Sequence, residues 1–136
     1  MANPEIKRPV LSDPLKDEQP RYLGREGQLY NNSTANIVPL GTVVQMGSGT
    51  LEPWDMTAAT PDGETIYGIL LEDVPPSSSF KVGVLIAGPA AIDPNYLKWS
   101  STTQTKIDIG LAALKNKKFI FARPAIVTGT YPEQVI

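Results

Sequence analysis

The sequence contains no cysteine and no histidine. Without cysteine there can be no disulfide bond, no thiolate nucleophile and no cysteine-based zinc site. Without histidine, the Ser-His and Cys-His pairs that activate nucleophiles are excluded too. Any catalysis would have to use carboxylate, lysine or tyrosine groups. The stability of such a chain must come from its hydrophobic core or from self-association.

Long apolar runs are also missing. No run approaches the roughly 18 residues that a membrane-spanning helix needs. The N-terminal stretch MANPEIKRPVLSDP lacks the apolar core of a signal peptide, so we expect synthesis in a cytoplasm without secretion. The net charge of −2 provides no general attraction to nucleic acid or to an anionic membrane. We therefore expect neither as a partner.

Proline and glycine, by contrast, are abundant, with 13 and 11 residues in a chain of 136. This composition favours one domain of short strands and many turns. Gly47-Ser48-Gly49 has the composition of a tight turn between two strands. The fold class that we predict is α+β, mostly β, with small antiparallel sheets. Strands are expected at residues 42–44, 50–54, 66–71, 82–87 and 119–122, with a short extension at 90–93.

One α-helix is expected at about residues 102–115. Three apolar residues share one helix face at positions i, i+4 and i+7: Ile107, Leu111 and Leu114. Ser101 and Gln104 have the spacing of a capping box at the N-terminus. Asn116 is expected to end the helix in the left-handed conformation.

The first 24 residues differ from the rest, because Pro4, Pro9, Pro14 and Pro20 recur every five or six residues. Proline removes a backbone donor and interrupts a helix, and it pushes the preceding residue to extended conformations. Residues 1–24 are therefore interpreted as an extended arm that is disordered when free. Residues 25–123 form the core domain, and 124–136 a C-terminal tail or edge strand.

Few residues are candidates for chemistry. Glu72 and Asp73 are adjacent at the end of a predicted strand, so their side chains point to opposite faces and cannot easily share one site. Asp62 lies in a turn with no evident partner, and no Asp-x-Asp-x-Asp spacing indicates a metal site. Trp54 and Trp99 could stack on bases or sugars, but packing in a core or an interface is favoured. We predict no catalytic, metal or cofactor-binding residue.

The order of the motifs goes further than any single motif. The stretches REGQLYNN, PLGTVVQ, LEPWD, PDGE, YGILLEDV, KVGVLIAGPAAID and LKW, followed by a helix, resemble the lambda-type head decoration proteins of tailed bacteriophages. The resemblance covers roughly Tyr22 to Arg123. The residues that carry it best are Gly41, Thr42, Trp54, Asp55, Gly68, Ile69, Leu70 and Trp99.

The resemblance implies a compact α+β fold and a homotrimer at the three-fold and pseudo-three-fold sites of an expanded icosahedral head. Its partners would be its own copies and the major capsid protein, with no small-molecule substrate and no cofactor. The protein would lie on the outer surface of the virion and stabilise the shell against the pressure of packaged DNA. It would not be an enzyme.

The arm then becomes a candidate for capsid binding. Aliphatic side chains within it would contact the shell, and its arginines would pair with capsid carboxylates. The residues in question are Ile6, Arg8, Val10, Leu11, Leu15, Arg21, Tyr22 and Arg25.

Three other functions stay open at this point. They are another virion protein, such as a tail or receptor-binding module; a small carbohydrate- or nucleic-acid-binding module; and an enzyme with paired carboxylates.

Overall fold

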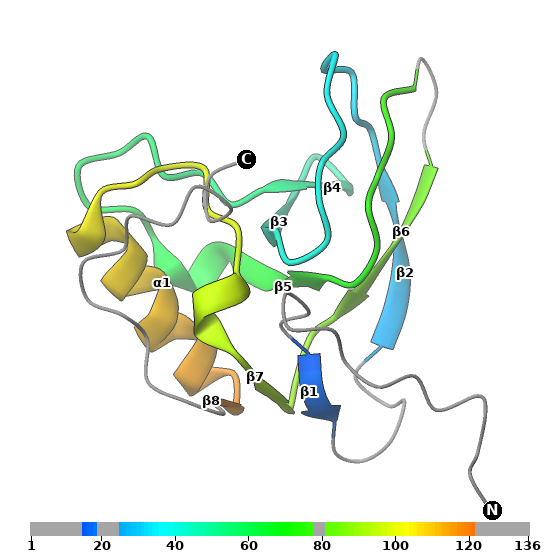
Figure 1. The fold of residues 1–136 in the computed structure, drawn as a ribbon. Helices are drawn as coiled ribbons and strands as arrows, with labels where there is room; N and C mark the ends of the chain where they lie inside the picture. The colour runs from blue at the N-terminus through cyan, green and yellow to red at the C-terminus, as the bar shows by residue number, and fades with distance from the viewer. Residues whose placement is uncertain (1–14, 19–24, 78–80, 122–136) are drawn as a thin grey trace, which may run out of the picture.

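The computed structural model describes residues 15–18, 25–77 and 81–121. Within them the chain forms a closed β-barrel, a second sheet and one α-helix (Figure 1). The elements in chain order are β1 (Leu15–Glu18), β2 (Arg25–Tyr30), β3 (Val43–Gly47), β4 (Thr50–Pro53), η1 (Gly63–Thr65), β5 (Ile66–Leu70), β6 (Lys81–Ile86), β7 (Ala90–Ile92), η2 (Pro94–Tyr96), α1 (Gln104–Asn116) and β8 (Phe119–Phe121). The prediction of a mostly β fold with one helix is confirmed.

The barrel has the strand order β2-β4-β3-β5-β6. Its β3–β4 hairpin turns at Ser48 and Gly49, whose φ angles are 51° and 85°. Two consecutive positive φ angles are typical of the two-residue turns that match the twist of antiparallel strands. Glycine tolerates this conformation without strain, so the turn lies where the sequence predicted it.

Among the described strands, five pairs are antiparallel, as predicted, and two are parallel. β2 pairs with β4 in parallel through Tyr30 and Leu51, and this pairing closes the barrel. In the second sheet, which has the order β1-β7-β8, β7 and β8 are also parallel. Parallel neighbours are joined by long crossovers. The crossover between β7 and β8 contains α1. Such non-local pairings leave no local pattern in the sequence.

Two hydrophobic cores result. The first fills the barrel and contains Tyr30, Val38, Val44, Leu51, Leu70, Val74 and Leu85. The second lies between the outer face of the barrel and the layer formed by α1, β7 and β8, as the arrangement in Figure 1 makes visible. Trp54, Ile69 and Trp99 belong to this second core, together with the buried helix face of Ile107, Leu111 and Leu114.

The Trp54–Trp99 pair occupies the centre of the second core. The two rings meet edge to face, with 6.0 Å between centroids and 67° between planes. Gly110 of α1 lies against both, because a Cβ atom there would come within 2.4 Å of Trp99 Cζ3 and 2.9 Å of Trp54 Cζ3. The helix can approach the pair this closely because residue 110 has no side chain.

Both ends of the helix differ from the prediction. Thr103 is the N-cap residue and its side chain makes no capping bond, while Gln104 Nε2 donates to Asp108 Oδ1 at 2.8 Å. The capping box is therefore absent, since the amide that would complete it is used within the helix. Asn116 is the last helical residue, and Lys118, with φ 73°, adopts the left-handed conformation.

β1 lies inside the segment that was interpreted as an arm. Its backbone is extended, and it pairs antiparallel with β7 of the same chain, with Leu15 opposite Ile92 and Glu18 opposite Ala90. The register shifts between Leu15 and Asp17. This part of the arm is thus an edge strand of the second sheet in the isolated chain, where the sequence predicted free disorder.

Candidate functional site

Most of the predicted capsid contacts fall outside the residues that the structure describes. This applies to Ile6, Arg8, Val10, Leu11, Arg21 and Tyr22. Leu15 begins β1, and Arg25 begins β2 with an exposed side chain. In Figure 1, β1 and the beginning of β2 lie toward the same, lower side of the molecule. The contacts themselves stay a prediction.

The β1-β7-β8 sheet is the surface from which both ends of the described chain depart. Residues 1–14 precede β1, one edge of this sheet, and residues 122–136 follow β8, its other edge. Ile120 in β8 exposes 68% of its surface, the largest fraction among the large hydrophobic residues that the structure describes. Lys115 Nζ lies 5.0 Å from the centroid of the ring of the next residue, Phe121, within the range of a cation–π contact. Because neighbouring side chains of a strand point to opposite faces, this contact lies on the other face from Ile120. The edge strand β8 therefore exposes one large apolar side chain, Ile120.

Glu72 and Asp73 follow β5, which ends at Leu70. Both are exposed, and Asp73 Oδ1 accepts a hydrogen bond from the backbone N–H of Leu40 at 2.7 Å. This bond joins the chain after β5 to the turn before β3, next to the isolated bridge between Val38 and Val74. Asp73 therefore has a structural role. Among the described residues, no group of three or more carboxylates could hold a metal ion.

The motif residues that carry the family resemblance mostly serve the fold. The N–H of Gly41, at φ 89°, donates to the Leu70 carbonyl at 2.8 Å. Thr42 is fully buried, and its Oγ1 donates to the Pro39 carbonyl at 2.6 Å. Gly68 has no room for a side chain, because a Cβ atom would lie 2.4 Å from the Ile86 carbonyl oxygen. These contacts fix the path of β5 between β3 and β6.

The two tryptophans are unsuited to stacking on a ligand, since each exposes only 1% of its surface. Trp54 Nε1 donates to the Asp62 carbonyl at 3.0 Å and to Thr65 Oγ1 at 3.1 Å. Asp62 also caps η1 by accepting from the Glu64 N–H at 2.9 Å. Asp62, a turn residue with no partner evident in the sequence, thus holds the loop around Trp54.

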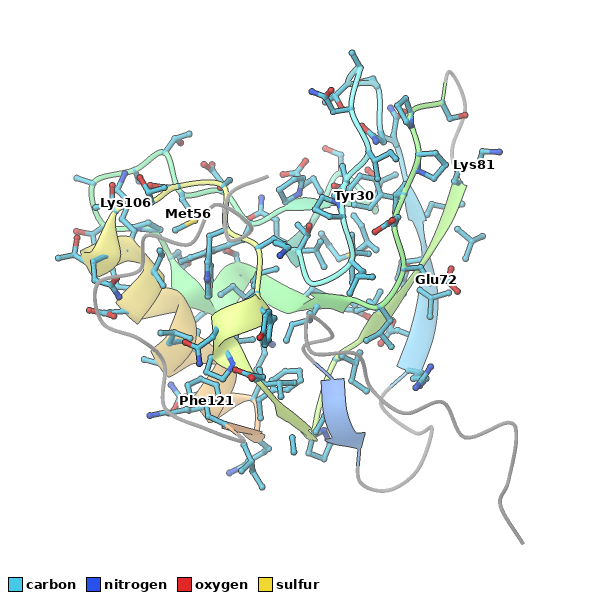
Figure 2. The ribbon with its side chains drawn as sticks, viewed as in Figure 1. Tyr30, Met56, Glu72, Lys81, Lys106 and Phe121 are labelled. Atoms are coloured by element: carbon cyan, nitrogen blue, oxygen red, sulfur yellow. The ribbon has the colours of Figure 1, made fainter. Side chains whose placement is uncertain are left out.

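A shallow cavity of about 530 Å³ opens beside this loop. It is lined by Glu52, Pro53, Trp54, Asp55, Met56, Thr57, Ser100 and Ser101. Asp55 Oδ1 already accepts from the hydroxyl and the N–H of Thr57, and these bonds lower the pKa of the Asp55 carboxyl. Lys106 Nζ donates to the Met56 carbonyl at 2.8 Å, and both residues are labelled in Figure 2. The polar groups of the cavity are therefore engaged in holding the loop.

A polar cluster on β2 and β5 was not anticipated from the sequence. The Tyr67 hydroxyl donates to Glu26 Oε2, which also accepts from Gln28 Nε2 at 2.7 Å. Glu26 and Gln28 alternate along β2 with exposed residues. This alternation, with a period of two, was the signal in the sequence that could have placed both side chains on one face of the strand. The hydrogen bond to Glu26 raises the pKa of Tyr67, and partial desolvation adds to the shift.

Exposed apolar side chains are the other feature that sequence reasoning missed. Within the described residues the large ones are Leu29, Ile37, Val82 and Ile120. Leu29 and Val82 are directly opposite each other in the β2–β6 ladder. Within the same described parts of the chain, no helix is long and apolar enough to span a membrane.

Comparison with models of known protein families identifies a relationship. The family model of the bacteriophage lambda head decoration protein D matches residues 6–120, most of the chain and the entire described core except Phe121. The match begins well before Tyr22, where the resemblance in the sequence began, and so includes much of the arm. None of the curated proteins compared with the chain matches it.

Proposed function

Because this chain belongs to the bacteriophage lambda head decoration protein D family, we propose that it binds as a homotrimer to the expanded phage head and cements it. The binding sites would be the three-fold and pseudo-three-fold positions of the outer shell, where the partner is the major capsid protein. The role is structural, as it is for the family. The observation that carries the proposal is the family match over residues 6–120.

The second sheet supports a definite orientation on the capsid. The arm residues 1–14 continue directly from β1, an edge strand of the β1-β7-β8 sheet. An arm reaches the shell over the shortest path when it leaves the molecule on the side that faces the shell. We therefore propose that this sheet lies next to the capsid, with the exposed Ile120 toward the shell.

The arm provides the binding mechanism. An extended peptide can add a strand to an open sheet edge of a capsid subunit through its backbone groups. Ordering such a segment costs roughly 2–5 kcal/mol of the gross interaction energy, so one arm binds weakly. Three arms on one trimer engage together and raise the avidity about 10²–10⁴-fold where the geometry allows simultaneous contact.

Binding to the expanded shell alone then stabilises that shell by mass action. A ligand that binds one state of a two-state system shifts the equilibrium toward that state, in proportion to its free concentration and affinity. Decoration would therefore oppose both disruption of the shell by internal DNA pressure and reversal of expansion. No covalent step is needed.

Truncation of the arm tests the proposal. Deleting residues 2–14 removes the part of the arm that precedes β1 and leaves β1 in place, whereas deleting residues 2–20 removes β1 as well. We expect the shorter deletion to leave a folded trimer that no longer cosediments with expanded, undecorated capsids and no longer raises their resistance to heat. The substitution Ile37→Ser, an exposed position distant from the second sheet in sequence, is the matched control and should bind normally. Full capsid binding by the shorter deletion would refute the arm mechanism, and absence of binding by the intact protein would refute the proposed function.

A further inference from the structure

The outer face of the β2–β6 ladder carries a paired apolar surface. Leu29 and Val82 are opposite each other and expose 46% and 64% of their surfaces. Gly27, two residues before Leu29, lies under Val82: a Cβ atom there would be 2.9 Å from Val82 Cγ1. The missing side chain lets Val82 lie flat across the ladder. Half-buried Val84, opposite Gly27, continues the same face.

This face is stiff as well as apolar. The β2–β6 pairing runs without interruption over all six residues of each strand, from Arg25 opposite Ile86 to Tyr30 opposite Lys81. Single exposed hydrophobic residues are common on protein surfaces, but contiguous apolar surface on a rigid element is typical of a binding site. Here two of the four large exposed hydrophobic residues among those described are direct neighbours.

Charges of both signs lie at the edges of the ladder, although strand alternation directs Lys81, which is opposite Tyr30, to the other side from Val82. Lys81, at the start of β6, is exposed and projects away from the barrel in Figure 2. Glu72, also exposed, lies beside β6, because the N–H of its neighbour Leu71 donates to the Val84 carbonyl at 2.8 Å. Figure 2 shows Glu72 on this side of the molecule. Around a three-fold axis each contact joins different parts of two copies, so the cation of one copy can pair with the anion of the next.

We propose that this β2–β6 face, with Leu29 and Val82 at its centre, is where one copy of the chain packs against the next around the three-fold axis. The inference rests on the homotrimer of the proposed function and assigns its contact surface. Around such an axis, one side chain can meet its own two copies, and Lys81 of one protomer can pair with Glu72 of its neighbour. The polar rim around an apolar centre is the usual anatomy of a protein interface.

The position of the face agrees with the orientation on the capsid. In Figure 1, β2 and β6 form one flank of the barrel, while β1, β7 and β8 lie toward the lower side of the molecule. Copies joined through this flank by a three-fold axis keep their β1 strands at the same end. All three arms then leave toward one surface, which simultaneous engagement requires.

The test is the molar mass of Val82→Glu, measured by sedimentation or light scattering beside the wild-type protein and Ile120→Glu. Three buried carboxylates near an axis would repel one another and lose their hydration, so we expect a folded monomer where the wild type is a trimer. Ile120→Glu, equally exposed but on the second sheet, should stay trimeric. A trimeric Val82→Glu refutes the assigned face and leaves the trimer intact. A monomeric wild-type protein refutes the trimer itself and the inference with it, while capsid binding by that monomer would still support decoration.

Unique thiols keep the inference testable if Val82→Glu fails to fold. Because the chain has no cysteine, Val82→Cys and Ile120→Cys each introduce the sole thiol. In the trimer we expect alkylation at position 82 to be at least about 10-fold slower than at position 120; equal rates would overturn the proposal.

A charge-reversal pair tests the proposed contact between Lys81 and Glu72. Lys81→Glu and Glu72→Lys should each weaken the trimer, and the double variant should restore it. A double variant no better than either single one argues against the pairing.

Discussion

For the substitution Gly110→Ala, helix propensity and tertiary structure predict opposite changes in the free energy of unfolding. Position 110 is in the middle of α1, where alanine is favoured over glycine by about 1 kcal/mol. From the sequence alone the variant should therefore be more stable. The structure gives the opposite result, because the added Cβ atom would lie 2.4 Å from Trp99 Cζ3, 2.8 Å from Trp99 Cη2 and 2.9 Å from Trp54 Cζ3.

The size of the effect follows from how little the neighbours can move. Both indole rings are 1% exposed and meet edge to face, so neither can rotate away without disturbing the second core. Overpacking of this kind costs typically about 1–3 kcal/mol, and distances this short place Gly110→Ala near the upper end. After the gain in helix propensity is subtracted, we expect a net loss of about 2 kcal/mol in the free energy of unfolding.

Urea unfolding at a fixed protein concentration measures this loss. Trp54 and Trp99 are the two tryptophans of the chain, so their fluorescence reports on the affected pair. Ala112→Gly is the control at an exposed position of the same helix and should lose about 1 kcal/mol through propensity alone. Trp99→Phe removes the ring atoms nearest to the new methyl group, so Gly110→Ala should cost much less in that background. A Gly110→Ala protein as stable as the wild type would show that the helix does not press against the tryptophans.

Two further predictions concern polar groups. Asn32 is 2% exposed, and its Nδ2 donates to the Asn36 carbonyl at 2.8 Å and the Val74 carbonyl at 2.9 Å, so Asn32→Ala should lose about 1–3 kcal/mol in thermal unfolding. The exposed neighbour Asn31→Ala is the control, and equal stability of the two variants would contradict the role of these bonds. Tyr67 has a pKa raised above its ordinary value of 10.0, so its protonated form is favoured in the folded state; the stabilisation is complete below about pH 10 and is lost as the pH rises through the higher folded value. Tyr67→Phe should therefore lose stability less steeply than the wild type between about pH 9 and pH 11, as followed by the urea midpoint; identical slopes would mean that the bond to Glu26 does not stabilise the fold.

Local signals accounted for most of the secondary structure. The glycines and serine at residues 47–49 predicted the hairpin, and apolar runs predicted β5, β6 and β8 to within a residue or two. The 3.6-residue spacing of Ile107, Leu111 and Leu114 predicted the helix and the face that it buries. These features depend on the backbone preferences and the side-chain periodicity of neighbouring residues, which a single sequence contains in full.

The helix ends show where such local reasoning stops. Ser101 and Gln104 have the right spacing for a capping box, yet Gln104 bonds to Asp108 and Ser101 Oγ accepts from the Thr103 N–H. The energies of competing local bonds differ by about 1 kcal/mol or less, so packing of the helix against the core decides among them. The same applies to the left-handed residue, which is Lys118 instead of Asn116.

The sequence by itself determined the class of the protein: a β-rich domain with one amphipathic helix, no chemistry of cysteine or histidine, and an order of motifs that led to its family. Only the tertiary structure decided that β2 meets β4 in parallel to close a barrel, that β1 joins β7, and that Gly110 must remain free of a side chain. Each of these depends on atoms brought together from distant parts of the chain. Their energies come from packing and backbone pairing across space, for which neighbouring residues in the sequence give no signal.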